Sequence, residues 1–154
     1  MKTNKICLLV LSLVLLGSAF AQERKIKRSE LPAAVEKTVV EQSKGATIRG
    51  FSEEQEKNGQ TTYEVEMIFN GHSKDVQMDA HGAVIEIEEQ LDLQAVPAAV
   101  RAGLEAQAAK GKITKIESIT KKDKLVAYEA QVVTDGKKSE VQVGPDGKPL
   151  HHEE

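Results

Sequence analysis

The hydrophobic positions of this chain change their spacing in the same order twice. Over residues 30–44 apolar side chains recur every three or four positions, which predicts a helix with one apolar face that ends at Gly45. The same spacing over residues 95–110 predicts a second helix that ends at Gly111. After each helix apolar and polar positions alternate, which is the pattern of strands with one buried face.

The alternating segments are separated by turn residues. Asn70-Gly71 and Asp135-Gly136 predict tight hairpin turns, because both central residues of such a turn have positive φ. The predicted strands cover residues 47–54, 63–69, 72–78 and 84–88 in the first half and residues 113–121, 128–133 and 137–143 in the second.

Two segments of the second half depart from a regular strand. Ile113, Ile116 and Ile119 are spaced three apart, and a regular strand cannot place all of them on one face, so we expect a bulge there. After residue 147 the chain is short and contains Pro149, which cannot pair fully. We therefore expect the second half to lack a complete fourth strand.

The two halves also align as sequences. Residues 31–82 match residues 96–147 without a gap, with several times more identities than average composition gives by chance. The identities include Pro-Ala-Ala-Val at the helix starts, Tyr-Glu in a strand and a glycine in each of two turns. The alignment indicates that one unit of helix and strands is used twice.

We therefore expect an α+β protein made of two tandem repeats, residues 29–90 and 91–150. A helix and a sheet that each have one apolar face bury both faces when the helix lies on the sheet. Two such units side by side would form one long antiparallel sheet, with two helices on one face and the other face open to water. Because each unit is small for independent stability, a shared core is the simplest expectation.

Both ends of the chain carry segments outside these repeats. Residues 1–21 have the features of a cleaved secretory signal peptide, with Lys2 and Lys5 before an apolar stretch and Ala19-Phe20-Ala21 as the cleavage site. An uncleaved anchor is the alternative, but the stretch is well short of the roughly 20 residues that a membrane span needs. Residues 22–28 are expected to be a flexible leader and residues 151–154 a polar tail. The mature protein would be periplasmic or secreted, without a membrane span.

Composition excludes several classes of function. The single cysteine, Cys7, lies in the predicted signal, so the mature chain would have no disulfide, thiol nucleophile or cysteine metal site. The net charge is −3, and removal of the signal makes it more negative; only 3% of residues are aromatic. These values argue against nucleic-acid binding, which needs a basic patch with stacking aromatic residues. We predict no cofactor, because the sequence has no glycine-rich phosphate loop.

Three motifs recur in the two halves. They are Leu31-Pro32-Ala33-Ala34-Val35, Tyr63-Glu64-Val65 and residues 76–82, with Val96-Pro97-Ala98-Ala99-Val100, Tyr128-Glu129-Ala130 and residues 141–147 in the second half. These motifs resemble those of PepSY-like domains, and tandem forms of that family look similar to the fold of the secreted beta-lactamase inhibitory proteins. The resemblance implies a protein that binds and restrains peptidases or other exported proteins, and it brings no catalytic motif. Gly144 departs from the pattern, because it stands where the first half has Asp79.

The open face of the expected sheet is the candidate binding surface. An acidic, concave face would suit a basic protein surface or cations. The competing interpretation is that the sheet simply exposes polar residues to water, and a slip of one residue in register would invert the face. Asp75 and Lys138 are expected there as well. The candidate partner-binding residues are Glu64, Glu66, Gln77, Glu86, Glu88, Glu129, Gln131, Glu140 and Gln142.

The other residues with possible chemistry are expected to have ordinary structural roles. Glu64 and Glu66 lie about 7 Å apart on one strand, a separation that suits acid–base chemistry, but no nucleophile or third group accompanies them. Tyr63 and Tyr128 occupy equivalent positions and are expected in the core, with ligand stacking as the alternative. We predict no metal site, because a tight site needs three or four fixed ligands and no such spacing surrounds His72, His81, His151 or His152.

Two classes of function remain. The first is an exported, non-catalytic module that binds an exported or cell-envelope protein, such as a peptidase that it would inhibit or modulate. The second is a periplasmic protein that binds a small ligand or a cation on its acidic open face. An enzyme is a distant third, because the sequence carries no catalytic constellation.

Overall fold

The computed structural model describes residues 22–56 and 58–150. They form one eight-stranded antiparallel sheet in which the strands follow one another in chain order. The strands are β1 Gln22–Lys25, β2 Thr47–Gln55, β3 Thr61–Phe69, β4 His72–Asp79, β5 Val84–Gln90, β6 Lys112–Lys121, β7 Lys124–Thr134 and β8 Lys137–Val143. The α-helices are α1 Ala33–Gln42 and α2 Ala98–Ala108, each preceded by a short 3-10 helix, η1 Arg28–Glu30 and η2 Leu93–Ala95.

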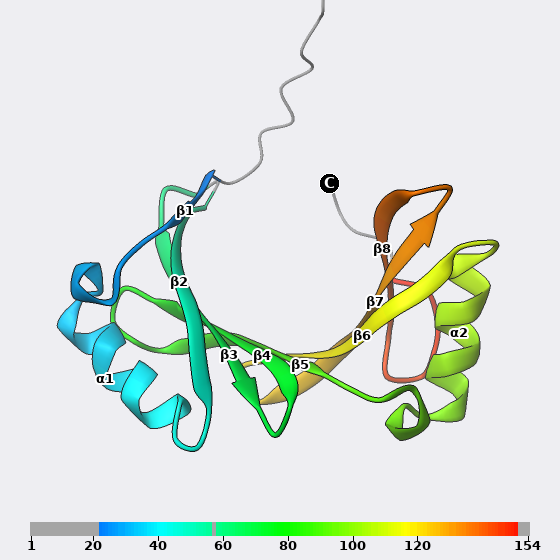
Figure 1. The fold of residues 1–154 in the computed structure, drawn as a ribbon, viewed down its shortest axis with the longest axis horizontal. Helices are drawn as coiled ribbons and strands as arrows, with labels where there is room; N and C mark the ends of the chain where they lie inside the picture. Colours follow the sequence, from blue (N-terminus) through cyan, green and yellow to red (C-terminus); the bar gives the residue numbers. More distant parts are fainter. Residues whose placement is uncertain (1–21, 57, 151–154) are drawn as a thin grey trace, which may run out of the picture.

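The sheet bends into a trough, and both helices lie on its outer, convex side (Figure 1). The α+β class, the antiparallel sheet and the placement of two helices on one face are therefore as predicted. None of the helices in the described part of the chain is long and apolar enough to cross a membrane. The predicted signal, residues 1–21, and the predicted tail, residues 151–154, lie outside the described residues.

The hydrophobic interior consists of two clusters rather than the single shared core that we expected. Val35 and Val39 of α1 join one cluster, and α2 contributes to the other, so each helix covers its own part of the sheet. The two parts are joined by pairing of β5 with β6, from Glu86↔Lys121 to Gln90↔Glu117. The first cluster also contains Phe51, Val65, Met67, Val76 and Met78, and the second contains Val96, Val100, Leu104, Ala108, Ile116, Tyr128, Ala130, Val132 and Val143.

The turns form as predicted, whereas both helices are shorter than predicted. Asn70 and Gly71 between β3 and β4 have φ values of 51° and 86°. The α-helices begin only after Pro32 and Pro97, because a proline disfavours the helical conformation of the residue before it. The residues ahead of each proline form the 3-10 helices instead.

The prediction of a flexible leader over residues 22–28 is wrong in part. Residues Gln22–Lys25 form β1, which pairs antiparallel with β2. The segment is polar because β1 is an edge strand, so its sequence lacks the apolar alternation that reveals an inner strand.

The isoleucines of β6 are divided between the two faces by irregular pairing. The register shifts between Ile113 and Lys115 and again between Ile119 and Thr120, so the predicted bulge is confirmed. Ile113 and Ile116 pack on the α2 side, whereas Ile119 pairs with Ala127, outside both helix-covered clusters, and is only 3% exposed. At the end of the sheet, as expected, the described residues after β8 add no further strand, and a single isolated bridge, Val143↔Pro149, is found among them.

Candidate functional site: the concave face of the sheet

Register brings all nine predicted residues to the face opposite the helices. In the first half their strand neighbours Val65, Val76 and Ile87 belong to or pack against the α1 cluster, and in the second half Ala130 and Val141 do the same with the α2 cluster. Alternation turns the intervening side chains to the concave side. Across the sheet they form rows of paired residues: Glu64, Gln77 and Glu86; Glu66, Asp75 and Glu88; Glu117, Glu129 and Gln142; and Lys115, Gln131 and Glu140.

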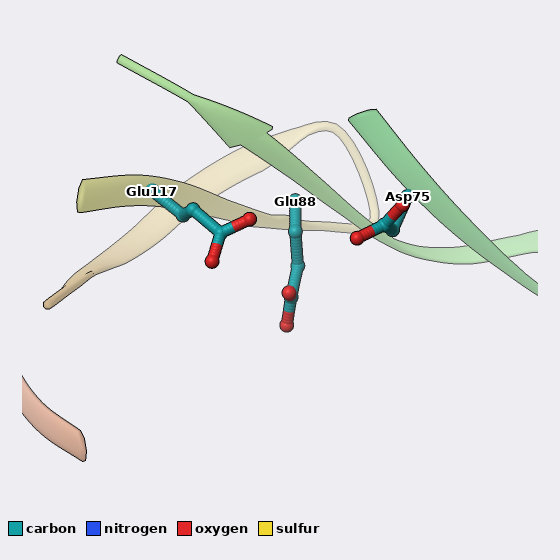
Figure 2. Close-up of side chains that lie close together, drawn as sticks. All are labelled: Asp75, Glu88 and Glu117. Atoms are coloured by element: carbon teal, nitrogen blue, oxygen red, sulfur yellow. The ribbon is translucent and has the colours of Figure 1, made fainter. Parts of the chain in front are cut away.

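Three carboxylates meet at the centre of this face. Asp75 on β4, Glu88 on β5 and Glu117 on β6 each have a carboxylate oxygen, and these oxygens lie within 4.8 Å of one another. Figure 2 shows the three side chains on neighbouring strands, with their carboxyl groups directed to the same side of the sheet. The cluster lies where the α1-covered and α2-covered parts of the sheet meet.

The concave face raises the proton affinity of its inner carboxylates. Burial raises the pKa of Glu88 to about 8, and the charges of Glu117 and Glu129 add to the effect. Burial likewise raises the pKa of Glu64 to about 7, and the charge of Asp75 makes the largest electrostatic contribution. Apolar surroundings produce this effect because they disfavour the charged form; beside Glu88, the paired residue on β6 is the buried Ile119.

Lysines neutralise some carboxylates of this face. The Nζ atom of Lys115 lies 2.5 Å from Oε1 of Glu117, whose side chain is only 4% exposed. Lys121 pairs with Glu86 at 3.0 Å, and Lys25 forms an ion pair with Glu66.

Three carboxylates close to the centre of the face lack such a partner. Within the described part of the chain, Glu64, Asp75 and Glu88 have no hydrogen bond or ion pair. Burial also raises the pKa of Asp75, and the charge of Lys115 opposes this shift. Glu64, Asp75 and Glu88 therefore form an acidic centre without ion-pair partners, and the carboxylates around it that are paired with lysines include Glu66, Glu86 and Glu117.

A hollow of about 190 Å³ opens over this acidic centre. Its volume is below the range of about 300–1,000 Å³ that drug-sized ligands occupy. It matches a single side chain or a hydrated ion better than an organic cofactor. Another hollow, of about 480 Å³, lies beside the end of α2, and none of the nine predicted residues lines it. The acidic hollow is lined by Glu54, Glu64, Asp75, Gln77, Glu86 and Glu88.

Sequence reasoning missed part of this site. Glu117 and Lys115 were not assigned to the open face, because the bulges in β6 make simple alternation ambiguous over that strand. Glu54 was missed because β2 also has a register shift, between Ile48 and Gly50. The isoleucine spacing of β6 signalled the irregularity but did not say which residues it would bring to the concave face.

No protein-family model matches the sequence, and comparison with curated proteins finds no match. Several solved structures are similar in fold. A protein described as periplasmic, from Bacteroides eggerthii DSM 20697, has a TM-score of 0.63 at 19% identity, over 79% of this chain and 86% of that one. A DUF2874 family protein from Bacteroides ovatus ATCC 8483 gives 0.60 at 18%, over 79% and 85%.

A third similar structure carries the most informative description. It is a BLIP-like protein from Bacteroides fragilis NCTC 9343, with a TM-score of 0.56 at 20% identity, over 77% of this chain and 82% of that one. At sequence identities this low, structural similarity establishes the fold alone. The chain therefore has a BLIP-like α+β fold.

Proposed function

We propose that this protein is an exported, non-catalytic module whose concave face binds a cationic segment of another exported or cell-envelope protein. The observation that carries the proposal is the group of Glu64, Asp75 and Glu88, which line one small hollow without a hydrogen-bond or ion-pair partner among the described residues. The signal-like residues 1–21 support export, as does the periplasmic description of a structural neighbour.

Charge and size favour a lysine or arginine side chain as the occupant. A half-buried carboxylate without a partner is costly, and a cation that enters the hollow removes part of that cost. Arginine suits the arrangement well, because its guanidinium group can donate to two carboxylates at once. The flanking amides Gln77 and Gln142 add donors and acceptors for the backbone of a bound segment.

The finer parts of the proposal concern ancestry and partner. We infer that the two halves are copies of one PepSY-like unit, because their motifs align without a gap and each half has one helix over its own strands. We also propose a peptidase as the partner class, with inhibition or modulation as the outcome. The BLIP-like fold and the resemblance of the motifs support this choice.

The test is binding by two charge-matched variants. Glu64→Lys/Glu86→Lys changes the concave face, and Glu41→Lys/Glu105→Lys makes the same charge change on exposed positions of α1 and α2. Affinity capture from the exported proteome, followed by assays of captured peptidases, should show a partner that the parent and the helix variant retain and the concave variant loses. Equal retention by all three folded proteins would overturn the proposed site.

A second candidate, cation binding, is favoured by the carboxylate oxygens of Asp75, Glu88 and Glu117 within 4.8 Å of one another. Calcium prefers oxygen ligands of this kind, although Lys115 already occupies one side of Glu117. Titration with calcium should then raise the melting temperature of the parent, because a ligand that binds only the folded state stabilises it. It should leave an Asp75→Asn/Glu88→Gln variant unchanged, and a flat response of the parent would exclude this candidate.

A further inference from the structure

The outer edge of β8 is only partly covered. Leu150 donates its backbone N–H to the carbonyl oxygen of Gln142, and Gly144 donates to Lys148. The residues after β8 therefore cover its last residues and leave the stretch before Gln142 as the open edge of the sheet.

The direction of the free backbone groups follows from these bonds. In an antiparallel strand, alternate residues direct both their N–H and C=O groups to the same side. The backbone carbonyl of Gln142 points away from β7, and β8 has no register shift. The backbone N–H and C=O groups of Lys138 and Glu140 therefore also point away from β7, towards the open edge. Among the described residues, no other strand lies beside these two, so two donors and two acceptors are open.

The side chains on this edge are complementary to themselves. Lys138 and Glu140 are exposed and share the concave face, and neither has an ion pair with another described residue. Ser139 lies between them. Under a two-fold axis through Ser139, each Lys138 would face the Glu140 of a second copy.

We propose that β8 pairs antiparallel with β8 of a second copy of this chain, centred on Ser139. The pairing satisfies the four open backbone groups of each copy and forms two ion pairs on the concave side. A slip of two residues in either direction would instead place two lysines or two glutamates opposite each other, and like charges in facing positions destabilise a sheet. The charge pattern therefore selects one register.

The opposite edge of the sheet is less suited to this role. β1 has four residues, and the ammonium group of its Lys25 is already paired with Glu23 and Glu66. An isolated lysine on an edge strand usually prevents pairing between copies. On β8, Lys138 would face Glu140 of the second copy, so this lysine would not prevent pairing between copies.

The arrangement places both concave faces on the same side. The two-fold axis of an antiparallel strand pair is perpendicular to the sheet, so two eight-stranded sheets would continue into one, with all helices on the other side. The proposal does not depend on what the concave face binds, because it uses only backbone groups and two rim charges. A partner protein that adds its own strand to β8 is the alternative occupant.

The experiment is sedimentation analysis of the mature chain, Gln22 to Glu154, at concentrations up to about 1 mM, where even weak specific association is detected. The parent should show a monomer–dimer equilibrium. Lys138→Glu should weaken dimerisation at least about tenfold because it creates facing acidic pairs. Lys138→Glu/Glu140→Lys should restore it, and Lys124→Glu, an equal charge change at an exposed position on β7, should have no effect.

Amide hydrogen exchange gives a second measurement on the same proteins. The N–H groups of Lys138 and Glu140 should become protected as the parent concentration rises, and should stay exposed in folded Lys138→Glu. A parent that remains monomeric, a dimer that ignores Lys138→Glu, or a folded double variant that fails to dimerise would each overturn the proposal. Protection of β8 by an exported partner but not by a second copy would assign the edge to the alternative occupant and would also overturn it.

Discussion

Thr38 in α1 donates a hydrogen bond from Oγ1 to the carbonyl oxygen of Gly82, 2.7 Å away in the turn between β4 and β5. The same turn presses against the helix backbone, because a Cβ atom added at Gly82 would lie 2.5 Å from the carbonyl oxygen of Ala34. The helix and the turn are thus in direct backbone contact. The equivalent contact in the other half joins Gly147 to the carbonyl oxygen of Ala99, 2.2 Å from an added Cβ.

Gly82→Ala should therefore lower the free energy of unfolding by about 3 kcal/mol, since it adds a clash with backbone to the cost of positive φ. Gly71→Ala is the matched control, because Gly71 has a similar φ of 86° and no atom within 4 Å of an added Cβ. It should lose only about 1 kcal/mol. Urea unfolding measures both, and equal losses would show that the turn does not press on α1.

Glu88 should make the protein less stable as pH rises. Its pKa is about 8 in the folded chain, above its ordinary value of 4.5, so the folded state holds the proton more tightly than the unfolded state. The resulting stabilisation is complete below about pH 4.5 and is lost as pH rises towards 8. Glu88→Gln keeps a neutral side chain and, because the site is partly solvated, should stabilise the protein by only about 1–2 kcal/mol at pH 8.5.

The control for this prediction is Glu86→Gln, two residues away on the same strand and face. Glu86 is paired with Lys121, and its charge is only a minor cause of the raised pKa of Glu88, so its replacement should reduce the slope of stability against pH much less than Glu88→Gln does. Urea unfolding of the parent and both variants from about pH 5 to pH 8.5 measures the slopes. Glu64, with a pKa of about 7, contributes a slope of its own; a slope that survives in full in Glu88→Gln would mean that Glu88 does not cause the dependence.

Lys115→Met should destabilise the protein because it leaves the buried carboxylate of Glu117 without its cation. The loss in the free energy of unfolding should be about 2–4 kcal/mol at pH 8, where removal of one partner of a buried pair has its full effect. Lys121→Met removes a more exposed partner, with 54% of its side chain accessible, and should cost less than about 1 kcal/mol. Thermal unfolding ranks the two variants, and similar losses would contradict the importance of the buried pair.

Binding of a cationic peptide to the concave face should tighten as pH rises from about 6 to about 9. Glu88 and Glu64, whose pKa values are about 8 and about 7, must release their protons before they attract the peptide fully. Calorimetry with an oligolysine peptide should show an affinity gain of about tenfold and proton release on binding. Glu64→Gln/Glu88→Gln should flatten the profile, whereas Glu41→Gln/Glu105→Gln on the helices should not.

The parts of the fold that were predictable are those with strictly local causes. The two hairpin turns follow from Asn-Gly and Asp-Gly, and the concave placement of Glu64 and Gln77 follows from alternation in β3 and β4. These strands lie wholly within the α1-covered part and pair without a shift along β3–β4. Their faces could therefore be assigned from the sequence alone.

The meeting of Asp75, Glu88 and Glu117 could not be predicted, because its causes are not local. Glu117 reaches Asp75 and Glu88 only through the register between β5 and β6, which two long segments and a bulge determine. The strand β1 was missed for a related reason. It depends on pairing with β2, and its polar edge sequence lacks the alternation of apolar and polar residues that predicts a strand. Partial burial of charged residues is likewise set by the bend of the whole sheet.

The order of the strands has a consequence for how this chain reaches its structure. Among the described residues each strand bonds only to its neighbours in the sequence, and a helix separates the partners in two pairs, β1–β2 and β5–β6. Loop-closure entropy is therefore small at most steps, which favours faster folding than in sheets whose paired strands are far apart in sequence. Since each helix packs on its own cluster, the N-terminal half can order around α1 before the C-terminal half orders around α2.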